Sequence, residues 1–469
     1  MSGVVLLNLP AGTWDRARQG GTPGAAHNAH TSDAAPGYPS PPTFLYCRGH
    51  ARRLKLAASP RELLATGQAP TPPHRLAKPP NPTQTPYGSV CQTAGNHRLM
   101  QSSIHSGTVR THRPLRIAMV APPWISIPAP TYGGIEEVVR LLCQGLVAHG
   151  HQVTLFAAPE SESDARVVAV LDEPQPDQIE HSLIEAAHVG SVFDRIDRER
   201  VDGAGFDVVH DHCPAVALAM ADRLREPFVH TLHGPFDEER TELYRRQGYK
   251  ATLVAISDSQ RSQAPDGVDC RHVVPNPIDL DEWPFQAEKA DELLFLGRID
   301  RDKGPHRAIE AAQRAGRRLA VAGPVQPDGE EFFATLVKPH LDGDRVRFLG
   351  ALGGDDKRHA LARARGLLMP IEWPEPFGLV MIEALATGTP VIAFDRGAAS
   401  EIVVDGENGF LVEDVDGMAA AIEQLDQIDA HHCRSSVQRF HVSAVCAAYE
   451  RVYAEAISRA APATGLAAR

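Results

Sequence analysis

Residues 116–158 read RIAMVAPPWISIPAPTYGGIEEVVRLLCQGLVAHGHQVTLFAA and decide the class of the fold. The apolar run at 116–121 ends in two prolines, which suits a buried parallel strand. After two glycines, the apolar residues of 135–146 recur at i, i+3, i+4, i+7 and i+11, the spacing of an amphipathic helix. A second apolar run at 153–158 completes strand, helix and strand, so this stretch predicts a βαβ unit of a parallel sheet.

The same alternation continues along the chain in two series. Strands are expected at 206–209, 227–231, 253–256 and 271–274, then, after a polar linker at 280–292, at 293–296, 319–322, 346–349, 366–369 and 390–394. Each strand ends in a small or polar cluster, and ligands of open parallel sheets bind at the carboxyl ends of strands. We therefore predict an α/β protein with two doubly wound domains, an N-terminal acceptor-side domain at 114–280 and a C-terminal donor domain at 281–469.

Residues 1–113 differ in composition from the rest of the chain. They hold 14 of the 38 prolines and 12 Lys and Arg against 3 Asp and Glu. Without a periodic apolar face, this segment cannot bury enough area to offset the entropy of ordering, so a disordered Pro-rich tail is expected. A targeting peptide and a start of translation at Met100 are the alternatives that the sequence leaves open.

Charge and cysteine usage narrow the class of protein. The whole chain carries −12, which leaves −21 on residues 114–469, and an acidic body argues against nucleic-acid binding because phosphate contacts need clustered Lys and Arg. No stretch approaches the ~20 apolar residues of a spanning helix, so at most peripheral membrane contact is expected. The seven cysteines are scattered, which favours reduced thiols in a cytoplasmic protein. The adjacent His431, His432 and Cys433 are a weak metal candidate, since neighbouring side chains do not converge easily on one ion.

The first motif with candidate chemistry is YGGIE at 132–136. Gly133 and Gly134 at the start of a helix let a ligand approach the backbone, and the N–H groups of the first turn favour an anion. A tight turn without a ligand is the alternative.

The second motif is GRIDRDKG at 297–304, which follows a strand and precedes a helix. Arg298 as a fork and Lys303 as a compact charge would suit a diphosphate. The alternative is a solvated loop in which Asp300 and Asp302 neutralise both cations.

The third and most specific motif is EPFGLVMIEALATGTP at 375–390. Glu375 precedes a helix that Pro376 helps to start and whose first turn suits Gly378. Glu383 lies inside this helix among apolar residues, where a carboxylate is costly without a partner. A pair of ligand hydroxyls would be such a partner, and a structural salt bridge is the alternative.

Together these motifs resemble the family-4 retaining glycosyltransferases. The resemblance rests on the block 375–393, on FLGRIDRDKG at 295–304 and on YGGIEEVV at 132–139, and it covers about residues 115–460. HVVPNPID at 272–279 is similar to the family's N-G-I-D stretch, with Pro277 where glycine is usual. The resemblance implies the GT-B architecture, in which two Rossmann-like domains face each other across a cleft and the final helix packs back toward the N-terminal domain.

The resemblance also implies a role for each matched residue. Arg298 and Lys303 would bind the donor diphosphate and neutralise its charge as it leaves. Glu383 would bind the donor ribose, and Glu375 would contact the transferred sugar near its anomeric carbon. The remaining donor-binding set is Gly133 and Gly134 on the N-terminal side, with backbone N–H groups of Phe377, Gly378, Leu379 and Val380.

On the acceptor side, His233 in Thr-Leu-His-Gly matches the family's active-site histidine, which contacts the donor sugar. His210 and Asp211 end a neighbouring strand, and for them contact with the acceptor and a structural role stay open. His210 and His212 would make a zinc pair only with a third ligand, and the sequence offers none.

The resemblance implies no metal and no other cofactor. Retention in such enzymes is ascribed to attack from the front face, with the leaving phosphate oxygen taking the acceptor proton. A double displacement would need a second carboxylate about 5 Å from the first, and no assigned residue fills that place.

The expected function is therefore a cytoplasmic, retaining hexosyltransferase. Its donor would be a nucleotide sugar, and its acceptor a hydroxyl group of a sugar, a lipid or a small molecule. A sugar-nucleotide epimerase with the same architecture and a non-catalytic sugar-nucleotide-binding protein are the alternatives. The sequence identifies neither the donor base nor the sugar nor the acceptor.

Overall fold

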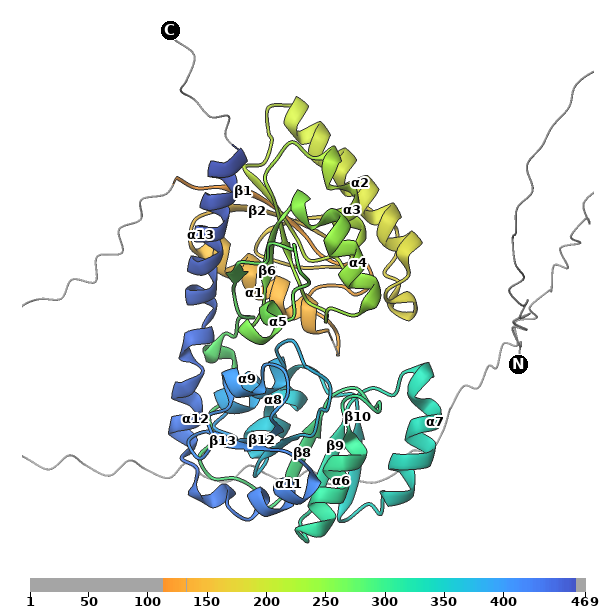
Figure 1. Cartoon of the computed structure of the whole chain (residues 1–469), viewed down its shortest axis with the longest axis vertical. Coiled ribbons are helices and arrows are strands. Elements are labelled where there is room, and N and C mark those ends of the chain that lie inside the picture. The colour runs from red at the N-terminus through yellow and green to blue at the C-terminus, as the bar shows by residue number, and fades with distance from the viewer. Residues whose placement is uncertain (1–112, 132, 461–469) are drawn as a thin grey trace, which may run out of the picture. The chain divides into compact units, whose positions relative to one another are not determined.

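The apolar runs form two parallel sheets in the computed structural model, which describes residues 113–131 and 133–460 (Figure 1). The strand order is β3-β2-β1-β4-β5-β6-β7 in the first sheet and β10-β9-β8-β11-β12-β13 in the second. Neighbouring strands pair in parallel, with Ile117 of β1 opposite Val153 on one side and Val208 on the other. The order of both sheets reverses beside the first strand of the series, which is the doubly wound arrangement.

The strands of the first sheet are β1 Arg116–Val120, β2 Gln152–Ala157, β3 Arg166–Ala169, β4 Val208–Asp211, β5 Phe228–Thr231, β6 Thr252–Ala255 and β7 His272–Val273. Its helices are α1 Gly134–Ala148, α2 Ser182–Val201, α3 Val216–Met220, α4 Glu238–Gln247 and α5 Asp258–Ser262. The strands of the second sheet are β8 Leu293–Leu296, β9 Leu319–Ala322, β10 Val346–Gly350, β11 Leu367–Met369, β12 Val391–Phe394 and β13 Gly409–Val412. The later helices are α6 Pro305–Arg314, α7 Glu330–Phe332, α8 Gly354–Arg363, α9 Leu379–Ala386, α10 Ala399–Ile402, α11 Val415–Ile422, α12 Ala430–Ser436 and α13 Val442–Ala460.

Both faces of the first sheet are covered because successive strand residues point to opposite sides. Ile117 and Met119 of β1 belong to a core shared with α1 and α13. Ala118 and Val120 belong to a second core, shared with α2, α3 and α4. The near-continuous apolar sequence of β1 is thus required by burial on both faces.

The second sheet is built in the same way. Leu294 and Leu296 of β8 face a core that includes α8 and α9. Leu293 and Phe295 face the opposite core, which includes α6 and α11. Each domain is therefore a sheet between two layers of helices.

The C-terminal helix α13 lies against the first domain, beside α1 in Figure 1. Its Tyr449 and Tyr453 are completely buried in the same core as Leu142 and Leu146 of α1. The carboxylate of Glu450 accepts hydrogen bonds from His149 at 2.8 Å and from His151 at 3.0 Å. Apolar packing and a polar clamp together fix this helix to the domain that the chain left at β7.

The prediction of two doubly wound α/β domains is confirmed. The edge strands β3 and β13 and the long helix α2 are among the elements that the sequence did not predict. The tail predicted at 1–113 falls outside the described residues except for Arg113. No described helix has the length and apolar character that crossing a membrane requires.

Candidate functional site

The residues predicted for the donor side lie on loops that follow two adjacent strands. Arg298 and Lys303 come directly after β8, and Glu375 comes after β11, which pairs with β8. The chain leaves β8 toward β9 and leaves β11 toward β12, on the opposite side of the sheet. Such a switch point is where open α/β sheets form a ligand crevice, so the fold brings these distant segments to one place.

Lys303 and Glu375 are joined directly. The distance from Nζ of Lys303 to Oε2 of Glu375 is 2.5 Å, and the two side chains are only 17% and 15% exposed. The ammonium also lies 5.0 Å from the ring centroid of Trp373, within the range of a cation–π contact. Because an ammonium carries three N–H donors, the pairing with Glu375 leaves donors for further oxygen atoms.

Arg298 is held on the same loop by different partners. Its Nε lies 3.2 Å from Oδ2 of Asp300, and its Nη1 donates to Oε1 of Gln326 at 3.3 Å. Oδ1 of Asp300 accepts the backbone N–H of Lys303 at 2.8 Å. One carboxylate therefore orients the arginine and fixes the backbone of the lysine. Of the two neutralised cations in the solvated-loop alternative, only Arg298 has an aspartate partner among the described residues, because the ammonium of Lys303 pairs with Glu375. No hydrogen bond or ion pair between described residues links Arg298 to Glu375.

Two glycines shape the loop that carries Glu375. Gly397 has φ +59°, and a Cβ there would lie 2.3 Å from the carbonyl oxygen of Glu375. The next residue, Ala398, donates its N–H to that same oxygen at 2.9 Å. Gly378 is the N-cap of α9 with φ +85°, one position before the helix, so its predicted place in the first turn is wrong. A left-handed backbone at both positions favours glycine.

Glu383 lies on α9 in an ion pair with Lys357 of α8. Oε1 accepts from Nζ at 2.6 Å, and the carboxylate side chain is 6% exposed against 27% for the lysine. The salt bridge that was the alternative for Glu383 is thus present. No described residue forms a hydrogen bond with the second oxygen, Oε2, so the pairing occupies half of the carboxylate.

The Gly133-Gly134 loop lies against the first residue of α9. A Cβ on Gly134 would be 3.5 Å from Cδ1 of Leu379, so the two loops predicted for the donor meet here. Gly133 is the N-cap of α1 with an extended backbone at φ −178°. A Cβ there would lie 2.5 Å from Cβ of Ala129. Glycine is therefore required at 133 because a Cβ would clash with Ala129, not because the backbone is strained.

Glu136, in the first turn of α1, was not selected from the sequence. Its side chain is buried and makes no ion pair with a described residue. A Cβ on Gly133 would lie 2.8 Å from its Oε2, so the carboxyl group sits directly behind the glycine loop. Burial raises the pKa of Glu136 to about 7, which makes it a titratable group at the edge of the predicted site.

His233 follows β5 on a loop that Gln260 clamps. The buried amide of Gln260 donates to the carbonyl oxygens of Leu232 at 3.0 Å and Gly234 at 2.8 Å, on either side of the histidine. Nε2 of His233 lies 2.8 Å from Nδ1 of His212. Burial, and then the charge of His230, lower the pKa of His233 to about 3, so its ring is neutral. No hydrogen bond or ion pair between described residues joins His233 to the residues predicted in the second domain.

His210 and Asp211 are completely buried at the end of β4. Nδ1 of His210 pairs with the hydroxyl of Tyr453 and Nε2 with Oγ1 of Thr231, both at 2.8 Å. Oδ2 of Asp211 lies 2.7 Å from Nδ1 of His230. With every partner in the interior, these two residues have the contacts of structural groups. Within the described ranges, no three His, Cys, Asp or Glu side chains gather as a metal site would need.

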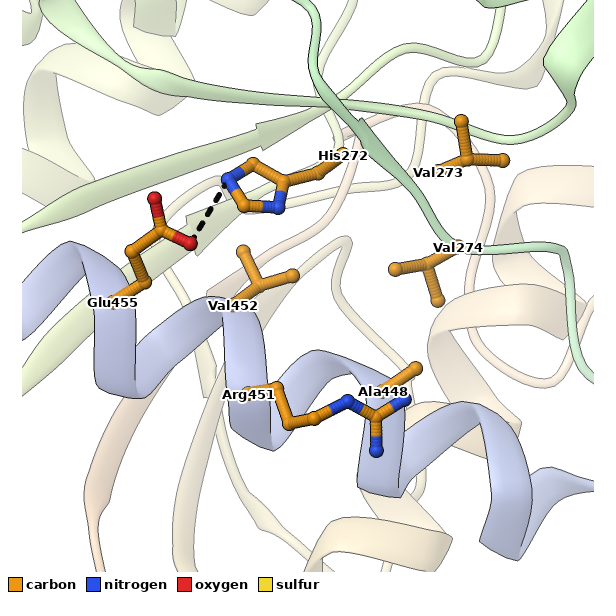
Figure 2. Close-up of a pocket in the computed structure, with 7 residues that line it drawn as sticks. All are labelled: His272, Val273, Val274, Ala448, Arg451, Val452 and Glu455. Atoms are coloured by element: carbon orange, nitrogen blue, oxygen red, sulfur yellow. Dashed lines mark ion pairs between the residues drawn. The ribbon is translucent and has the colours of Figure 1, made fainter.

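A small cavity lies elsewhere, between β7 and α13 (Figure 2). It has a volume of about 150 Å³. His272 and Glu455 face each other beside it, with Nε2 to Oε2 at 3.6 Å. None of the predicted site residues lines this cavity, so it is separate from the strand-end loops.

Several residues of the site were missed by sequence reasoning. Trp373 stands two positions before Glu375, and an aromatic residue beside the motif is a signal that could have been used. Lys357 and Gln260 had no such signal, because one lies on a charged helix and the other in a polar segment far from the residues they hold.

Two family models match the chain in succession. Residues 132–282 match Glycosyltransferase Family 4, and residues 279–435 match Glycosyl transferases group 1. The matches meet in the segment that connects the two sheets.

Curated relatives match over most of their length. The D-inositol 3-phosphate glycosyltransferase of Frankia alni is 31% identical, over 60% of this chain and 82% of the relative. The glycogen synthase of Mycobacterium tuberculosis is 28% identical, over 66% of this chain and 86% of the relative. The phosphatidyl-myo-inositol mannosyltransferase of Mycolicibacterium smegmatis is 29% identical, over 72% and 93%.

Solved structures share the two-domain fold. AviGT4, a glycosyltransferase involved in avilamycin A biosynthesis, is 26% identical with a TM-score of 0.55, over 74% of this chain and 99% of that protein. Anabaena HepE in complex with UDP-glucose is 20% identical with a TM-score of 0.56, over 74% of this chain and 100% of that protein.

Proposed function

Because this chain belongs to the family-4, group 1 glycosyltransferases of the GT-B fold, we propose that it transfers a hexose from a nucleotide sugar to a hydroxyl acceptor with retention at the anomeric carbon. Glycosyl transfer follows from the family. The nucleotide-sugar donor, the hexose and the stereochemistry are the proposal.

One observation carries the proposal: the ion pair of Lys303 with Glu375 at the switch point of the second sheet. A cation and a carboxylate held 2.5 Å apart suit a substrate whose diphosphate lies next to sugar hydroxyls. The first N–H groups of α9 lack intrahelical acceptors and add positive potential nearby. Glycines at 133 and 134, at the start of α1, would let a phosphate approach the backbone from the first domain.

The donor would be held from the nucleoside to the sugar along α9. The oxygen of Glu383 that accepts no hydrogen bond from a described residue would accept a ribose hydroxyl, while Lys357 orients the carboxylate. Arg298 and Lys303 would bind the diphosphate, and Glu375 would accept hydroxyls of the transferred sugar. His233 would contact the same sugar from the first domain.

In the proposed reaction, the bond between C1 and the phosphate oxygen breaks as the acceptor oxygen bonds to C1 on the same face. The acceptor proton passes to the leaving phosphate oxygen, so the atoms balance without a further base. Negative charge grows on the diphosphate in this step, and fixed cations stabilise it most in the transition state. Arg298 and Lys303 are therefore assigned to leaving-group stabilisation without a metal ion, and turnover is expected to persist in excess EDTA.

The relatives indicate where to begin the search for substrates. HepE was solved in complex with UDP-glucose. The curated relatives are named as a glycogen synthase, a phosphatidyl-myo-inositol mannosyltransferase and a D-inositol 3-phosphate glycosyltransferase. Donor bases and acceptors of these classes should therefore be screened first.

The experiment is a two-step assay on the full chain. UDP, GDP and ADP are compared by thermal shift, since a ligand at 100 times its Kd adds about 2.7 kcal/mol of stability. The corresponding α-linked nucleotide hexoses are then incubated with the protein and an acceptor panel, water included, and the first product is examined by proton NMR. An α-configured product is expected.

A β-configured first product would contradict retention. Accumulation of an epimer of the sugar would indicate an epimerase, and donor binding without transfer or hydrolysis would indicate a non-catalytic binding protein. Lys303→Ala, with exposed Lys338→Ala as its matched control, tests whether any activity found belongs to this site.

A further inference from the structure

Four histidines gather where β4 and β5 end. His210, His212 and His230 are almost completely buried, and His233 is half-buried on the loop after β5. The hydrogen bonds of this group determine which ring nitrogens carry hydrogen.

His212 and His233 share one hydrogen bond. Nδ1 of His212 and Nε2 of His233 are 2.8 Å apart, and the ring planes differ by only 27°. Such an edge-to-edge contact needs a hydrogen on one of the two nitrogens and a lone pair on the other. Burial lowers the pKa of both rings, so each is neutral and has one N–H.

The second nitrogen of His212 decides between the two arrangements. Its Nε2 is buried and has no hydrogen-bond partner among the described residues. If Nε2 carried the hydrogen, a buried N–H would stay without an acceptor, which is the rarer and costlier defect. With the hydrogen on Nδ1, only a lone pair is left unused.

The ring of His212 is held in this orientation by His210. The two ring centroids are 4.2 Å apart. Both nitrogens of His210 are engaged, with Tyr453 and Thr231, so this neighbour is itself fixed and offers no nitrogen to His212.

We propose that His212 is a positioning residue, which donates from Nδ1 to Nε2 of His233 and thereby fixes His233 as its Nδ1–H tautomer. The hydrogen bond made by one ring nitrogen sets the protonation of the other. His233 then presents an N–H donor at Nδ1, where it makes no hydrogen bond with a described residue. If the proposed function holds, this N–H donates to an oxygen of the transferred sugar. The sugar hydroxyl is then the acceptor of the hydrogen bond, and His233 is the donor.

The tautomer is measured directly by ¹⁵N–¹H correlation spectra of the full chain labelled at histidine. The signals of His233 are identified by their loss in His233→Gln. Nδ1–H is expected for His233 in the wild-type protein. His212→Phe, which keeps a ring without nitrogen, should shift His233 toward Nε2–H, whereas His212→Asn should retain Nδ1–H because its amide N–H replaces that of Nδ1.

Turnover is the second readout. His212→Phe should lower kcat about five- to tenfold, the effect of one neutral hydrogen bond, and His212→Asn should restore most of it. His188→Phe is the packing control, since His188 is a buried histidine on α2 that makes no hydrogen bond to the four histidines; it should change neither readout.

Nε2–H on His233 in the wild-type protein would overturn the inference, and so would an unchanged spectrum in a folded His212→Phe. If that variant does not fold, the wild-type and His212→Asn spectra decide the matter. The spectra need no substrate, so an absence of glycosyl transfer with a correct tautomer would refute the proposed function alone.

Discussion

Lys357→Met should destabilise the protein more than Glu383→Gln, although both changes remove the same ion pair. The reason is the unequal burial of the partners: the side chain of Glu383 is 6% exposed and that of Lys357 is 27% exposed. Glu383 also lies among fully buried apolar residues of α9, including Ile382 and Ala384.

The magnitude follows from what each change leaves behind. Without Lys357, the buried carboxylate has no charge partner, and breaking a buried pair in this way costs about 3–5 kcal/mol. In Glu383→Gln, the side chain of Lys357 can turn its ammonium toward water. The loss should then cost at most about 1 kcal/mol, as for an exposed ion pair. The two variants should therefore differ by about 2 kcal/mol or more in the free energy of unfolding.

Urea unfolding at pH 7 followed by circular dichroism measures this difference. The double variant Lys357→Met/Glu383→Gln should be more stable than Lys357→Met alone, because the buried charge is gone. Equal midpoints for the two single variants, or a less stable double variant, would refute this account of Glu383.

Three further outcomes are expected. Lys303→Ala and Arg298→Ala should each lower kcat by about 10²–10³ at saturating donor, while Lys338→Ala stays near wild type; near-normal turnover in both would rule out the diphosphate assignment. Excess EDTA should leave the initial rate unchanged, and loss of activity that Mg²⁺ or Mn²⁺ restores would contradict the metal-free proposal. Burial raises the pKa of Glu136 from 4.5 to about 7, so the folded state keeps this proton to higher pH than the unfolded state, and the free energy of unfolding should fall by about 3 kcal/mol as the pH rises between these values. In thermal unfolding as a function of pH, Glu136→Gln should lack this decrease. An equal decrease in both proteins would disprove the assignment.

The elements that carry the site were predictable because burial on both faces leaves a strong sequence signal. β1, β8 and β11 are short apolar runs, and the residues that follow them stand out as glycines and charges. The edge strand β3 lacked that signal, since its pattern of exposure leaves Arg166 and Ala169 at the surface. In α2, buried Glu185 and His188 together with exposed Leu183 obscure the helical periodicity.

The partners of the site residues were less predictable than the residues themselves. The sequence singled out Lys303, Glu375 and Glu383, but not that Lys303 pairs with Glu375 or that Glu383 pairs with Lys357. These contacts join positions 72 and 26 residues apart, and only the packing of the helices and loops sets such distances. The tautomer inferred for His233 depends likewise on a contact between two strand ends.

The most direct test of the central claim is calorimetric titration of the nucleoside diphosphate into Glu375→Gln and Glu383→Gln, with exposed Glu331→Gln as the control. Glu383 is assigned to the ribose, so Glu383→Gln should weaken binding of the nucleotide and raise KM while kcat changes little. Glu375 is assigned to the sugar beside the anomeric carbon, so Glu375→Gln should bind the nucleotide almost normally and lose kcat. If Glu375→Gln loses the nucleotide and Glu383→Gln keeps it, the assignment of the donor along α9 is contradicted.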